Sequence, residues 1–172
     1  MKKLLEILAL CLLLSINVYA SENEFPLDSE ITYGKLDNGF TYYIRENQTP
    51  KDKVRIKLII KTGSIMEEEN QLGLAHLLEH MAFNGSKNFP KKKIDEYMSS
   101  IGLNLGSHYN ASVSFLKTHY VYEIPTKNDK DVEVALKILT DISKNLTFEP
   151  EAFERERKIV EEEWRRDIGG SK

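Results

Sequence analysis

Alternating apolar and polar residues predict three strands and a hairpin. In residues 53–62 every second side chain is apolar and those between are charged, which is typical of a half-buried strand. The apolar positions are Val54, Ile56, Leu58 and Ile60. Residues 105–115 and 118–125 are also predicted strands. Within residues 31–47, Asp37-Asn38-Gly39 predicts a tight turn between two strands, because these residues tolerate positive φ.

Four other segments have the periodicity of helices. The first is about 73–83, and the second opens at Pro90 and stops at Gly102. Residues 129–146 have an apolar stripe at helical spacing, and Pro150 opens a last helix over about 151–168. Strands followed by two helices, then strands and two helices again, predict an α+β fold. We expect a mostly antiparallel sheet with helices packed on one face.

The first twenty residues have the pattern of a signal peptide. Lys2 and Lys3 precede an apolar stretch, and Val18-Tyr19-Ala20 resembles a cleavage site. The apolar run is shorter than the ~20 residues that span a bilayer, so we expect no stable membrane anchor. The sequence therefore predicts an exported protein, periplasmic or secreted, whose mature domain covers residues 21–172.

Charge and cysteine content narrow the chemistry. The 172 residues carry a formal net charge of −3, and loss of Lys2, Lys3 and Glu6 with the signal peptide makes it −4. A mildly acidic chain argues against a nucleic-acid partner. The single cysteine, Cys11, lies in the predicted signal peptide. A metal site in the mature chain must therefore use histidine and carboxylate ligands.

Such ligands are present in the helix over 73–83, as His76-Leu77-Leu78-Glu79-His80. Positions i and i+4 share a helix face, so His76 and His80 can bind one ion. A catalytic zinc keeps about three protein ligands and one open position. Glu79 lies on the same side, where a carboxylate can take a proton from an activated water. Leu74, Leu77, Leu78 and Met81 are predicted to form a separate apolar face of this helix. The alternative is an ordinary amphipathic helix that happens to carry these polar residues.

Candidates for a third ligand lie further along the chain. His108 and His119 fall on predicted strands. In the last helix, a stripe contains two glutamates that share a face with apolar residues, while Glu161 and Glu162 point elsewhere. The stripe is Phe153, Glu156, Val160 and Glu163. A carboxylate on a core-facing stripe is costly unless it is paired or bound to a metal. Periodicity alone equally allows a solvated, charge-rich helix in which these glutamates have no chemical role.

Together these segments resemble a known family. His76-Leu77-Leu78-Glu79-His80 is the H-x-x-E-H pattern of the inverzincins, and the block from Gly63 to Pro90 around it looks like the pitrilysin/insulinase family of zinc metallopeptidases. Tyr109 to Ser112 resembles the family's substrate-binding edge strand, and "ERERKIVEEEW" its distal glutamate helix. The long separation of His80 from Glu163 looks like the bacterial periplasmic branch.

The resemblance implies a role for each matching residue. His76, His80 and Glu163 would bind one Zn²⁺ per chain, and Glu79 would be the general base. Glu156 would orient a ligand histidine from outside the ligand shell. Asn110 and Ala111 would bind a peptide or unfolded protein substrate as an added strand. The expected function is that of a zinc-dependent endopeptidase.

The length of the chain departs from the family pattern. Family members form a closed chamber from two halves with two similar α+β domains each, so this chain looks like an incomplete first domain. We therefore expect a missing C-terminal half or a partner subunit. The alternatives are a non-catalytic chain that binds zinc or peptides, one half of a two-chain peptidase, and an adaptor in which these residues are structural.

Overall fold

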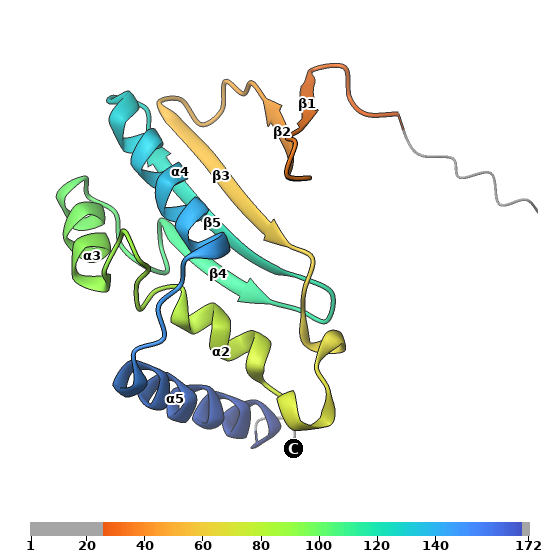
Figure 1. Cartoon of the computed structure of the whole chain (residues 1–172). Helices are drawn as coiled ribbons and strands as arrows, with labels where there is room; N and C mark the ends of the chain where they lie inside the picture. Colours follow the sequence, from red (N-terminus) through yellow and green to blue (C-terminus); the bar gives the residue numbers. More distant parts are fainter. Residues whose placement is uncertain (1–25, 170–172) are drawn as a thin grey trace, which may run out of the picture. The chain divides into compact units, whose positions relative to one another are not determined.

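The computed structural model describes residues 26–169 (Figure 1). The predicted signal peptide, residues 1–20, lies outside the described residues. The chain divides into two compact units between Gln48 and Thr49, and the single domain over 21–172 stays a prediction. Among the described helices, none is long and apolar enough to cross a membrane.

The N-terminal unit contains the predicted hairpin. Strands β1 (Ile31–Lys35) and β2 (Thr41–Arg45) are antiparallel, with Lys35 opposite Thr41. The turn between them places Gly39 at a φ of 88°, which L-residues with side chains rarely adopt. The hairpin follows from Asp37-Asn38-Gly39 as predicted.

The second unit contains a three-stranded antiparallel sheet. Its strands are β3 (Lys53–Ile60), β4 (Tyr109–Val113) and β5 (Thr118–Pro125), in the order β3-β5-β4. β4 is shorter than the predicted strand over 105–115 because the chain turns at Gly106, whose φ is 86°. After β3, Gly63 lies against the turn between β4 and β5. A Cβ at Gly63 would be 2.1 Å from the Ser114 carbonyl oxygen, so no larger residue fits there.

Each predicted helix is present, with ends shifted by a few residues. Two short 3₁₀ helices, η1 (Ser64–Met66) and η2 (Glu69–Gln71), precede α2 (Leu74–Met81). Helix α3 spans Lys91–Ser100, α4 spans Asp129–Lys144, and α5 spans Pro150–Gly169. Asn128 caps α4, since its side chain accepts a hydrogen bond from the Lys130 N–H.

One face of the sheet packs against helices. Apolar residues of β3, β4 and β5 form the main core with α3 and α4, and its most deeply buried residues include Tyr122, Met98, Ile124 and Ile138. On the other face, Arg55, Lys57 and Ile59 of β3 are exposed. The predicted α+β fold, an antiparallel sheet with helices on one face, is confirmed.

Helix α2 packs between the edge strand β4 and helix α5 (Figure 1). A second, smaller core joins the two helices, in which Leu77 and Met81 contact Val160. This arrangement corrects the predicted apolar face of α2, because Leu74 and Leu78 are each 37% exposed. The helix is buried on two sides, one against α5 and one against the sheet, and Leu74 and Leu78 lie on the ridge between them.

Candidate metal centre

The two histidines of α2 point at a common position. His76 and His80 are one helical turn apart, and their Nε2 atoms are 3.2 Å from each other. Their rings are nearly perpendicular, at 81°. Two imidazole nitrogens at this distance repel unless a proton or a cation lies between them. The geometry of the pair therefore suits a shared proton or a shared cation.

Helix α5 adds a carboxylate to this pair. The Oε2 atom of Glu163 is 3.4 Å from His76 Nε2 and 3.5 Å from His80 Nε2. Atoms that bind one tetrahedral zinc at about 2.05 Å lie about 3.3 Å apart. The three distances of 3.2, 3.4 and 3.5 Å fit this requirement, and the fourth corner of the tetrahedron carries no described ligand. The residues present thus fit a catalytic zinc.

The stripe on α5 separates Glu163 from its acidic neighbours. Glu161 pairs with Arg157, and Glu162 pairs with Arg165, on the exposed side of the helix. Glu163 is only half exposed because it faces α2. The structure therefore places Glu163 at the histidine pair and leaves Glu161 and Glu162 in ordinary surface ion pairs.

Glu79 lies beside the three candidate ligands but is not one of them. Its Oε2 atom is 3.9 Å from the Nε2 atoms of both His76 and His80. The residue is only 7% exposed, and burial raises the pKa of its carboxyl group above the ordinary range. A carboxylate with raised proton affinity, next to an open coordination position, is suited to accept a proton there.

Glu156 contacts the far side of one histidine. Its Oε2 atom is 3.2 Å from His80 Nδ1, so the carboxylate accepts a hydrogen bond from Nδ1–H, and Nε2 is then free to bind a cation. Burial raises the pKa of Glu156, but hydrogen bonds from Asn84 and His80 outweigh it, and the net pKa lies below the ordinary value. Glu156 is therefore an anion at neutral pH.

His76 is held in the form that binds metals. Burial lowers its pKa, and the neighbouring His80 lowers it further, against the opposing charges of Glu163 and other acids. A lowered pKa favours the neutral imidazole, whose free nitrogen lone pair is the metal-binding group.

The other candidate histidines lie elsewhere. Among residues 26–169, the single cluster of three potential ligands is His76, His80 and Glu163. His119 points to the opposite face of the sheet from its neighbour Tyr120, which is buried in the core, and its ring contacts Ser112. The His108 ring accepts a hydrogen bond from the Asn104 N–H in the turn before β4. Neither histidine reaches the cluster.

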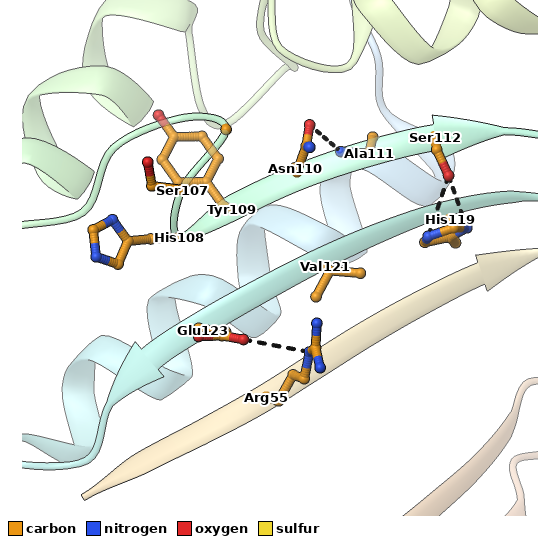
Figure 2. A pocket seen from close by; sticks show the side chains of 11 residues that line it. Arg55, Ser107, His108, Tyr109, Asn110, Ala111, Ser112, His119, Val121 and Glu123 are labelled. Carbon is orange, nitrogen blue, oxygen red and sulfur yellow. Dashed lines mark hydrogen bonds and ion pairs between the residues drawn. The ribbon is translucent and has the colours of Figure 1, made fainter. Parts of the chain in front are cut away.

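Asn110 and Ala111 lie on β4, which is an edge strand of the described sheet. The Ser114 N–H and the His108 carbonyl form hydrogen bonds to β5 and the residue just before it, and in an antiparallel pair every second residue of a strand bonds to its neighbour in this way. Ala111 lies at one of the positions between, so its backbone groups face the free edge. The Ala111 N–H donates to the Asn110 side chain at 2.9 Å. As Figure 2 shows, Asn110 also lines a shallow pocket of about 280 Å³ on the open face of the sheet.

Two residues that bond to the ligand-bearing helices could not be identified from sequence patterns. Both carboxylate oxygens of Glu67 accept hydrogen bonds at the start of α2, from Gly73 N–H at 2.9 Å and Ala75 N–H at 2.7 Å. Asn84, which directly follows the predicted helix over 73–83, bonds to residues of both α2 and α5. Both residues lie in loops, where no periodicity marks them.

Comparison with known proteins places the chain in a family. Residues 42–167 match the family described as Insulinase (Peptidase family M16). The probable zinc protease PqqL of Haemophilus influenzae is 40% identical over 146 residues, and that of Escherichia coli is 41% identical over 140. These matches cover 85% and 81% of this chain, but only 16% and 15% of the relatives.

Solved structures agree with these matches. The crystal structure of the periplasmic protease PqqL from E. coli superposes with a TM-score of 0.78 at 41% identity, over 81% of this chain and 16% of that one. A structure of the first half of the same protease gives 0.78 at 40% identity, over 82% of this chain and 30% of that one. The chain belongs to the insulinase family of peptidases, family M16.

Proposed function

We propose that this chain carries the catalytic zinc site of an endopeptidase that hydrolyses peptides or small unfolded proteins. The observation that carries the proposal is the triangle of two imidazole nitrogens and one carboxylate oxygen, with sides of 3.2, 3.4 and 3.5 Å. The zinc proteases among its relatives support the metal and the reaction.

His76, His80 and Glu163 would hold one zinc ion per chain. Zinc in such a site supplies Lewis acidity, which makes water acidic near neutral pH and polarises a carbonyl group. Glu79 accepts a proton from the attacking water and afterwards delivers it to the leaving amine, so the same carboxylate takes up and returns the proton. Glu156 keeps His80 in the tautomer whose Nε2 is free.

The free edge of β4 would bind the substrate. An extended peptide adds to this edge through backbone hydrogen bonds, which are indifferent to side-chain identity. Binding there requires the Asn110 side chain to release the Ala111 N–H, which it occupies in the described structure. Side chains of the bound strand that point to the open face would lie near the pocket in Figure 2.

The same relatives and the sequence support a place of action. The predicted signal peptide over residues 1–20 directs export, and the E. coli relative is described as periplasmic. We propose that this chain acts in the periplasm or outside the cell after signal-peptide removal.

The test uses Glu79→Gln, which removes the base but keeps the side-chain size. The variant should bind zinc as the wild type does and lose hydrolysis of an unfolded protein by several orders of magnitude. Glu162→Gln is the matched control, since Glu162 is an exposed acid in an ion pair with Arg165. Where the Glu162→Gln protein is as active as the wild type, equal activity in Glu79→Gln would remove Glu79 from the mechanism.

The second candidate function is binding of zinc or peptides without turnover, alone or as one half of a two-chain peptidase. The chain spans about 16% of the length of its relatives, and the family resemblance implies that a second half contributes to the substrate chamber. Bound zinc with no hydrolysis by the chain alone, and hydrolysis on adding the remaining portion of such a peptidase, would select this function.

A further inference from the structure

Asn84 lies where the two ligand-bearing helices meet. It follows the last residue of α2 by three positions, and its backbone N–H donates to the Met81 carbonyl at 2.9 Å. The residue is half-buried, and its side chain bonds to Arg155 of α5.

Its amide group bonds to both helices. The Nδ2 atom donates to the carbonyl oxygen of His80 at 3.2 Å. The Oδ1 atom accepts from Arg155 Nη2 at 2.7 Å and lies 3.4 Å from Lys91 Nζ. Arg155 in turn contacts Glu156 Oε1 at 3.4 Å. One side chain thus joins the backbone of a candidate ligand residue to the part of α5 that holds Glu156.

We propose that Asn84 is a positioning residue for the metal site, which sets the placement of α5, and with it Glu163, against the histidines of α2. The inference rests on the proposed function and deepens it. The apolar contact of Leu77 and Met81 with Val160 holds the helices together. Such contacts are not directional, whereas the hydrogen bonds of Asn84 fix where α5 begins to run past α2.

The distance along α5 from Glu156 to Glu163 makes this placement important. Glu156 and Glu163 are seven residues apart, which is about 10 Å along a helix axis. A tilt of about 5° would move Glu163 by about 0.9 Å, well beyond the ~0.2 Å within which metal–ligand distances must fall. A small error at Asn84 therefore becomes a lost ligand at Glu163.

The experiment measures zinc affinity of the intact protein by competition with a chromophoric chelator. Asn84→Ala removes all side-chain bonds and should weaken zinc binding by about tenfold or more, as loss of a group that supports ligands does. Asn84→Asp keeps the acceptor for Arg155, removes the donor to His80 and Glu156, and adds a charge beside Glu156. It should also weaken binding, and it guards against a simple packing defect.

Asn145→Ala is the matched control. Asn145 is also a half-buried asparagine just after a helix, and its Nδ2 atom donates to Asp141 at 2.7 Å, away from the cluster. Its loss should lower the melting temperature of the zinc-free protein but leave zinc affinity unchanged. Visible spectra of the Co²⁺-substituted proteins should change for Asn84→Ala, as for Glu163→Gln, and stay like wild type for Asn145→Ala.

Wild-type zinc affinity in both Asn84 variants would overturn the inference, whatever their thermal stability. Equal weakening by Asn145→Ala would overturn it too, because the effect would then be one of general stability. Wild-type protein that binds no zinc would refute the proposed function itself, so the two failures are distinct.

Discussion

Replacing Glu163 by glutamine should lower the zinc affinity by more than a hundredfold. The substitution keeps the side-chain size and removes the charge of an oxygen that lies 3.4 and 3.5 Å from the two histidine nitrogens. Loss of a group that merely supports a ligand costs about 10- to 100-fold in affinity. Loss of one ligand in three should lower the affinity by more than the hundredfold upper limit of that range. A hundredfold change in affinity corresponds to about 2.8 kcal/mol.

Chelator competition near neutral pH provides the assay, with Glu162→Gln as the control on the same helix. Glu162 carries the same charge one residue away, and its side chain is 64% exposed and paired with Arg165. If the long-range charge of α5 were the cause, both variants would weaken zinc binding alike. Equal effects of the two substitutions, or unchanged affinity in Glu163→Gln, would refute the assignment of Glu163 as a ligand.

Two further predictions concern stability. Met81→Ala should lower the free energy of unfolding by about 2–5 kcal/mol, because Met81 is fully buried where α2 packs on α5. Leu78→Ala, on the exposed ridge of the same helix, should lower it far less. Denaturant titrations measure both values. Burial raises the pKa of Asp141, but hydrogen bonds from Asn145 and Ser86, among others, lower it to about 2. Since this lies below the unfolded value, the carboxylate stabilises the fold above about pH 4, and this contribution is lost as the pH falls towards about 2. Asp141→Asn protein should therefore lose less stability over that interval in melting curves, and an unchanged loss would contradict the reasoning.

Local patterns predicted the elements of the fold but not how they meet. The alternation in β3 identified the core face correctly, because side chains alternate strictly along a strand. The faces of α2 were predicted less well. A single apolar face including Leu74 and Leu78 was expected, but the helix is buried on two sides, and only the contacts with α5 and β4 determine which sides these are.

The candidate site divides in the same way. The i,i+4 spacing was enough to pair His76 with His80, and the apolar stripe on α5 distinguished Glu163 from its acidic neighbours. Periodicity could not show that α5 crosses α2, so a solvated α5 remained open until the structure brought Glu163 to the histidines. Asn84 contributes through a loop conformation and a long-range contact with Arg155, neither of which has a sequence pattern.

The zinc content of the purified, folded protein tests the central claim most directly. Elemental analysis of wild type should find about one zinc per chain, and the His76→Ala, His80→Ala double variant should retain none while keeping the helical circular dichroism of wild type. Well-folded wild-type protein without zinc, or a double variant that keeps its zinc, would contradict the account.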